Sequence, residues 1–140
     1  MIGNPKEFDI NMIKNSNILV LAFMGDSVYT TFVRSKIVSQ GFKTGKLNYI
    51  CNKYVCALGQ SVAIDYIKDM LDEEEFRICN TARNAHTKNI AKHSTHEVYS
   101  KATSFEALIG YLYLTNNTER LDFILNYVFE KVGEYYDNRR

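Results

Sequence analysis

Proline and glycine are scarce in this chain of 140 residues. There is one proline, Pro5, and there are only 7 glycines. A β-sandwich or barrel needs turn residues at short, regular intervals to separate its strands. Because such residues are missing, the sequence argues against a fold of many short strands and predicts an all-α domain of ordinary size.

Long apolar runs and paired cysteines are missing as well. No hydrophobic stretch approaches the length of a membrane span, and the N-terminus lacks the apolar core of a signal peptide. The three cysteines, Cys51, Cys56 and Cys79, include no C-x-x-C pair. An odd set of thiols without such pairs is typical of a reducing compartment. We therefore expect a cytoplasmic protein without disulfides or membrane contact.

Charge of both signs is present but is segregated along the chain. The formal net charge is only +1, yet residues 27–64 contain no acid. The cations of that stretch are Arg34, Lys36, Lys43, Lys46 and Lys53. Residues 77–101 carry five more cations and all three histidines against a single acid, Glu97. This pattern predicts a basic face on a nearly neutral protein, although ordinary solvated helix faces would produce the same pattern.

Apolar spacing predicts two helices in the first half of the chain. The first is expected after a cap at Ser16 or Asn17, with a stop at Gln40–Gly41. The second is expected from about Leu47 to Leu71.

Three further helices are expected in the second half. The acids of Asp72–Glu75 suit the start of a helix that ends near Arg83–Asn84. Residues 85–100 are polar and aperiodic, which predicts a long loop, and helix resumes over 104–114. A cap at Thr118 starts the last helix. The expected boundaries are a lead-in over 1–15, a helical domain over 16–136 and a tail over 137–140.

Two acids lie within apolar helix patterns. Asp26 follows Gly25 in LAFMGDSVY, and Glu106 lies one helical turn before Gly110 in SFEALIGYLYL. A glycine beside each acid would let two helices approach closely, so we expect the acids to meet at one helix crossing. Two carboxylates there would repel each other unless a cation joined them. Mg²⁺ suits such a site because it binds carboxylate oxygens and keeps several waters.

Each acid also has a purely structural alternative. Thr103 and Glu106 match the spacing of a capping box, in which the glutamate bonds back to the backbone of the threonine. Asp26 could instead cap a helix that restarts after Gly25. Replacing Glu106 by glutamine separates these alternatives, because glutamine closes a capping box but is a poor ligand for a hard metal ion.

The two acidic segments resemble a known family. Leu21–Tyr29 looks like the signature helix of the ribonuclease III endonuclease domain, and Ser104–Leu114 resembles its second acidic helix. Ala82–Ala85 and Tyr99–Glu106 are similar to the Mini-ribonuclease III subtype, which has no double-stranded-RNA-binding module. The larger enzymes of the family carry four acids in the site.

Only two of those four acids are matched in this chain. Ala22 and Thr103 occupy the positions of the other two, which fits the reduced acid set of the subtype and leaves the number of metal ions open. Thr103 would then serve as a cap or as a neighbour of the metal ligands. The resemblance thus carries over Asp26 and Glu106 alone as acidic ligands.

The resemblance implies an all-α, ribonuclease III endonuclease-domain-like helical bundle, with residues 16–136 as the catalytic domain. It implies an endonuclease that hydrolyses double-stranded RNA with Mg²⁺, or Mn²⁺ as a substitute, and leaves 5′-phosphate and 3′-hydroxyl ends. Asp26 and Glu106 would be the catalytic metal ligands. The implied substrate is the precursor of large-subunit (23S) ribosomal RNA, and the implied assembly is a two-fold homodimer.

Basic and polar residues near position 85 are the expected RNA contacts. These candidates are Arg83, Asn84, Lys88 and Lys92. They would contact the phosphates and 2′-hydroxyls of the shallow minor groove, although a solvated loop without RNA contacts is the alternative.

The histidines are not expected to be catalytic. His93 and His96 have a spacing that zinc could use, but no cysteine or acid completes a tetrahedral site. The apolar residues Phe23, Leu112 and Tyr113 are expected in the core or in a dimer contact.

Two other functions remain open at this point. One is a double-stranded-RNA-binding scaffold that has lost the chemistry, and the other is a helical protein-interaction module. The retention of two acids in apolar helices favours the enzyme over the scaffold, because a scaffold would need neither.

Overall fold

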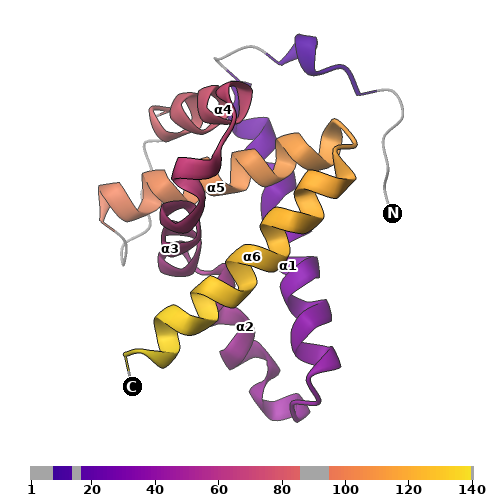
Figure 1. Cartoon of the computed structure of the whole chain (residues 1–140), viewed down its shortest axis with the longest axis vertical. Helices are drawn as coiled ribbons and strands as arrows, with labels where there is room; N and C mark the ends of the chain where they lie inside the picture. Colours follow the sequence, from indigo (N-terminus) through magenta and orange to yellow (C-terminus); the bar gives the residue numbers. More distant parts are fainter. Residues whose placement is uncertain (1–7, 14–16, 86–94, 140) are drawn as a thin grey trace.

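The computed structural model of the chain describes residues 8–13, 17–85 and 95–139. These residues form helices and contain no strand, which confirms the expected all-α class (Figure 1). The α-helices are α1 (Leu19–Ser39), α2 (Leu47–Val55), α3 (Ala57–Ile67), α4 (Glu73–Arg83), α5 (His96–Leu114) and α6 (Thr118–Asp137). The short 3-10 helices are η1 (Ile10–Met12), η3 (Thr44–Lys46) and η4 (Lys68–Met70).

Helix α5 is the central element of the bundle. It packs against α1, α3, α4 and α6, and its longest contact is with α1, which it crosses steeply (Figure 1). From Ala102 to Leu114 its residues are buried except Glu106 and Tyr111, so most of its circumference faces other helices. Helix α6 runs across the front of the bundle in Figure 1 and buries one apolar stripe. The buried residues of that stripe are Leu121, Ile124, Leu125, Val128 and Val132.

The expected second helix is divided into α2 and α3, so the single helix over 47–71 was wrong. Cys56 between them has an extended backbone, with φ −69° and ψ 167°. Its sulfur accepts a hydrogen bond from the backbone N–H of Gly59 at 3.4 Å and so caps α3. A Cβ atom on Gly59 would overlap the backbone carbonyls of Lys53 and Tyr54. The glycine therefore permits the tight junction at which the chain changes direction.

Helix α5 begins eight residues before the expected start, at His96, so the predicted loop over 85–100 was too long. Thr95 caps the helix, because its side chain accepts a hydrogen bond from the N–H of Val98 at 3.1 Å. The first turns contain buried hydroxyl residues that donate to carbonyls one turn earlier. Ser100 donates to His96 at 2.8 Å, and Thr103 donates to Tyr99 at 3.0 Å. These internal bonds satisfy side chains whose polarity had suggested a loop.

The start of α4 was predicted correctly. Asp72 accepts a hydrogen bond from the N–H of Glu75 at 2.8 Å, and Glu75 accepts one from the N–H of Asp72 at 2.9 Å, which closes a capping box. Glu75 is almost fully buried and forms an ion pair with Arg120 at 2.8 Å. The pair ties the start of α4 to the start of α6.

The other expected helix ends have mixed outcomes. Helix α1 stops at Ser39, and Gly41 follows with φ 79°, as the sequence predicts. Its N-cap is Ile18 rather than Asn17, while Ser16 lies outside the described residues. The N-cap of α6 is Asn117, so Thr118 is the first helical residue and not the cap.

All three cysteines are free thiols. Within the part of the chain that the structure describes, no helix combines the length and the apolar character that a membrane crossing requires.

Candidate active site

Two glycines set the distance between α1 and α5 where these helices cross. A Cβ atom on Gly25 would overlap the backbone carbonyl of Glu106 and would approach the backbone nitrogen of Gly110. A Cβ atom on Gly110 would likewise overlap the backbone carbonyl of Leu21. Only glycine at both positions allows the two helix backbones to touch here. The residue after Gly25, which is Asp26, is therefore held next to Glu106.

Asp26 and Glu106 meet at this crossing, as the sequence predicts. Both line one surface pocket of about 380 Å³, and their side chains share a hydrogen bond. Asp26 is exposed, whereas Glu106 is partly buried. Ala22 and Thr103, which stand where larger enzymes carry further acids, line the same pocket.

The structural alternatives for the two acids are wrong. Helix α1 continues through Gly25 and Asp26, so Asp26 caps no restarted helix. Thr103 lies inside α5, seven residues after its start, so it cannot be the cap of a capping box with Glu106. Its hydroxyl donates to a backbone carbonyl of its own helix instead.

The environment of Glu106 disfavours its charged form. Burial, the negative charge of Asp26 and the hydrogen bond with Asp26 together raise the pKa of Glu106 from 4.5 to about 8. A hydrogen bond with Gln60 acts in the opposite direction and lowers the pKa. Near neutral pH Glu106 therefore keeps its proton unless a cation neutralises the charge at this site.

Gln60 is a site residue that the sequence analysis missed. It lies on α3 and is 2% exposed. Its Nε2 atom donates to the carbonyl of Val55, the last residue of α2, at 3.1 Å. A carbonyl only accepts, so this bond fixes the orientation of the amide and directs its remaining N–H to Glu106. The available signal was a glutamine within an otherwise apolar helix.

The carboxylates of Asp26 and Glu106 fit a divalent metal ion of the Mg²⁺ type. Both are hard oxygen donors, and their mutual repulsion is what a divalent cation would remove. In the described ranges no group of three or more histidines, cysteines or acids gathers at one point. Mg²⁺ needs no such group, because it is commonly held by one or two carboxylates and completes its shell with water.

The expected RNA contacts lie only partly within the described residues. Arg83 ends α4 and Asn84 is its C-cap, and both side chains are exposed. Lys88 and Lys92 lie outside the described residues, as do His86 and His93. His96 is the first residue of α5.

The three aromatic and apolar residues expected in the core or a dimer contact separate into two groups. Leu112 and Tyr113 are buried in the core of the bundle. Phe23 is 84% exposed and lines the pocket of the two acids. An aromatic ring so exposed beside the site excludes a core role for Phe23 and favours a contact with another molecule.

Comparison with known proteins agrees with this geometry. A family model described as the ribonuclease III domain matches residues 19–117, a range that includes both acids and both crossing glycines. The chain belongs to the ribonuclease III family.

Its relatives within the ribonuclease III family include proteins named Mini-ribonuclease 3. The one from Clostridium tetani is 38% identical over 135 residues, which cover 95% of this chain and 89% of the relative. The one from Thermoanaerobacter is 41% identical and covers 83% of this chain and 82% of the relative. A crystal structure of a protein from Fusobacterium nucleatum superposes with a TM-score of 0.74, at 30% identity, over 87% of this chain and 96% of that one.

These relatives confirm the resemblance to Mini-ribonuclease III and the ribonuclease III fold. The chain is accordingly an endoribonuclease of the ribonuclease III type, a family whose enzymes depend on metal ions and act on double-stranded RNA.

Proposed function

We propose that this chain hydrolyses phosphodiesters in double-stranded RNA with Mg²⁺ held by Asp26 and Glu106. The single observation that carries the proposal is the convergence of these two acids at the glycine crossing of α1 and α5. By the resemblance of this chain to the Mini-ribonuclease III subtype, the substrate proposed is the precursor of large-subunit (23S) ribosomal RNA, cut to leave 5′-phosphate and 3′-hydroxyl ends.

The residues of the pocket have distinct roles in this proposal. Asp26 and Glu106 hold the ion, and Gln60 orients the Glu106 carboxylate through its fixed N–H. The Thr103 hydroxyl already donates to the carbonyl of Tyr99, so it can only accept a hydrogen bond from a water in the pocket. When bound, the ion activates water as the nucleophile and stabilises negative charge on the phosphate.

The duplex is positioned by groups around the pocket. Arg83 and Asn84 at the end of α4, followed by Lys88 and Lys92, contact phosphates and 2′-hydroxyls of the minor groove. Each phosphate contact by a cation should add about 1 to the slope of log K against log salt. Replacing Arg83 by alanine should lower that slope, and an unchanged slope would remove Arg83 from the RNA contact.

A two-fold homodimer would supply the two sites that cutting both strands requires. Phe23, which lines the pocket, is 84% exposed, and Val20, three residues earlier on α1, is 48% exposed, which supports a contact with a second copy. Replacing Phe23 by aspartate should shift the protein from dimer to monomer in sedimentation velocity. If the variant remains a dimer, Phe23 is not part of the interface.

A cleavage assay on structured RNA tests the chemistry. Wild-type protein should cut with Mg²⁺ and stop when EDTA is added. Asp26→Asn should reduce the cleavage rate by about 10²- to 10³-fold or more, the range seen when a group that stabilises transition-state charge is removed. RNA affinity and thermal stability should remain close to those of the wild type.

Asp122→Asn is the matched control, because Asp122 is exposed on α6 and does not line the pocket. It should cut at the wild-type rate. If the wild-type protein binds duplex RNA and never cuts it at any concentration of Mg²⁺ or Mn²⁺, the chain is a binding scaffold and the proposal is wrong.

A further inference from the structure

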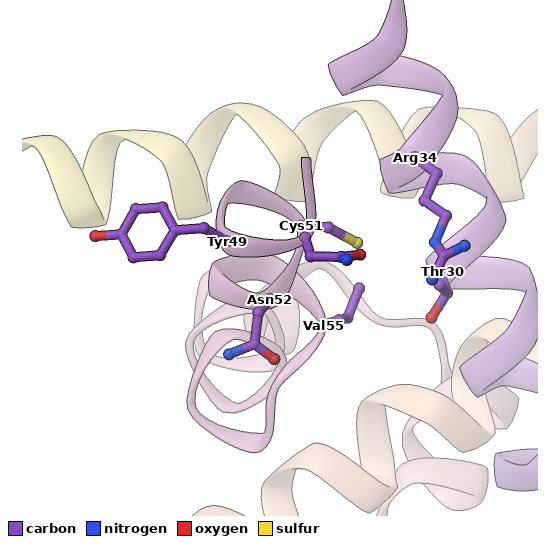
Figure 2. A pocket seen from close by; sticks show the side chains of 7 residues that line it. Thr30, Arg34, Tyr49, Cys51, Asn52 and Val55 are labelled. Carbon is purple, nitrogen blue, oxygen red and sulfur yellow. The ribbon is translucent and has the colours of Figure 1, made fainter. Parts of the chain in front are cut away.

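A second pocket lies between the C-terminal half of α1 and helix α2. Its volume is about 450 Å³. Thr30 and Arg34 line the α1 wall, and the side chains of Cys51 and Val55 point across the gap from α2 (Figure 2). The ring of Tyr49 points away from α1, so it leaves the gap open to solvent (Figure 2).

The polar groups of this pocket are hydrogen-bond donors placed on two facing helices. Thr30 and Arg34 are four residues apart on α1, and Asn48 and Asn52 are four residues apart on α2. Residues at this spacing share one helix face. A guanidinium, a hydroxyl and the amide of Asn48 therefore line one space without an acid among them, whereas the amide of Asn52 points downward rather than toward α1 (Figure 2). This is the donor set that binds the oxygens of a phosphate.

Arg34 has no partner that would occupy its charge. Among the described residues it makes no hydrogen bond and no ion pair, and its side chain is exposed. The stretch from 27 to 64 contains no acid that could provide one. Two neighbouring cations are already engaged by aromatic rings, because Lys36 lies over Phe32 and Lys53 lies over Tyr49. The guanidinium of Arg34 is thus available to an external anion.

The pocket and the candidate active site lie along one line on α1. Asp26, Thr30 and Arg34 follow each other at intervals of four residues, beside the buried stripe that contains Tyr29 and Val33. Eight residues of α-helix span about 12 Å. A duplex whose phosphate lies at Asp26 would therefore run close to Arg34 as well.

We propose that the pocket between α1 and α2 binds a backbone phosphate of the RNA substrate, away from the phosphate that is cut. Arg34 makes the charge-assisted contact, and Thr30 and Asn48 donate the remaining hydrogen bonds. This inference rests on the proposed function, because it extends the substrate contact of the same site. The residues that line the pocket all lie within the acid-free stretch 27–64.

The test measures binding of a double-stranded RNA by fluorescence anisotropy over a range of KCl concentrations. Every protein carries Asp26→Asn, so that the RNA stays intact. Arg34→Gln should raise the Kd about tenfold and lower the salt slope by about 1. Arg34→Lys should keep the slope and lose part of the affinity, because an ammonium keeps the charge but lacks the planar fork.

Arg77→Gln is the matched control. It removes the same charge, but Arg77 lies on α4 and is paired with Glu74 at 2.6 Å. Its Kd should remain close to that of the parent, and thermal unfolding should show that all variants fold. Equal Kd values for Arg34→Gln and Arg77→Gln would overturn the phosphate pocket.

A titration with inorganic phosphate separates RNA from a small anion. Phosphate that binds in an Arg34-dependent way while Arg34→Gln leaves RNA affinity unchanged would assign the pocket to a free anion and refute the inference. The two proposals fail separately. If RNA binding depends on Arg34 but the chain with Asp26 intact never cuts RNA, hydrolysis alone is refuted. If the chain with Asp26 intact cuts RNA but binding does not depend on Arg34, the pocket alone is refuted.

Discussion

Glu106→Gln should remove the loss of stability that the metal-free protein shows as pH rises from about 5 to 8.5. The folded protein holds a proton on Glu106 up to a pKa of about 8, whereas the unfolded chain releases it near 4.5. Between these values the folded state binds more protons, so the free energy of unfolding falls as pH rises. The stabilising contribution is complete below pH 4.5 and is lost above about pH 8. At about 1.4 kcal/mol per pH unit, the loss amounts to about 4 to 5 kcal/mol.

The glutamine variant cannot lose this contribution, because its side chain is neutral throughout. With EDTA present, the free energy of unfolding of the variant should equal that of the wild type at pH 5. At pH 8.5 the free energy of unfolding of the variant should be several kcal/mol higher than that of the wild type. Excess Mg²⁺ should restore the wild type at pH 8.5 and leave the variant unchanged, because an ion that binds only the folded state stabilises it. Urea unfolding followed by circular dichroism measures both effects.

Glu75→Gln is the control with the opposite sign. Burial alone would raise the pKa of Glu75, but hydrogen bonds from Arg120 and from the N–H of Asp72 outweigh it and hold the pKa below its ordinary value. The contribution of ionised Glu75 to stability is therefore present above the unfolded pKa and is lost as pH falls. Glu75→Gln should lower the free energy of unfolding at neutral pH, and the difference from the wild type should be smaller in acid. If wild type and Glu106→Gln lose stability in parallel between pH 5 and 8.5 in EDTA, Glu106 does not carry the proton and the reasoning is refuted.

Three further outcomes follow from the packing. Gly25→Ala should destabilise the fold by about 3 kcal/mol or more, because the added methyl group overlaps the backbone carbonyl of Glu106. Gly45 has open space around it, so the control Gly45→Ala should unfold at the same temperature as the wild type. Tyr29→Phe should be as stable as the wild type or up to about 1 kcal/mol more stable, because the buried hydroxyl of Tyr29 has no hydrogen-bond partner among the described residues. A clearly lower free energy of unfolding in urea would show that the hydroxyl has a partner. Gln60→Leu should weaken Mn²⁺ binding by about 10- to 100-fold, as measured by electron paramagnetic resonance. Unchanged Mn²⁺ binding would show that Gln60 does not orient the Glu106 carboxylate.

The sequence was sufficient wherever the physical cause was local. Helical periodicity, the stop at Gly41 and the acidic start of α4 depend on neighbours within one or two turns. Gly25 precedes Asp26, and Gly110 follows Glu106 by one helical turn, so the close helix crossing could likewise be predicted from the sequence. The all-α class and the meeting of the two acids could be predicted from these patterns, and the family from the resemblance of the two acidic segments to ribonuclease III.

Tertiary structure alone decided the features that depend on contacts between distant segments. The break at Cys56 exists because Gly59 lets α3 pack against the end of α2, and the break leaves the carbonyl of Val55 free for Gln60. The early start of α5 could not be predicted, because burial of its hydroxyl residues against other helices outweighs their weak helix propensity. The raised pKa of Glu106 also needs the fold, since desolvation and the charge of Asp26 act only once the helices have crossed. Local spacing therefore determined which residues form the site, and packing between helices determined their electrostatics and their supports.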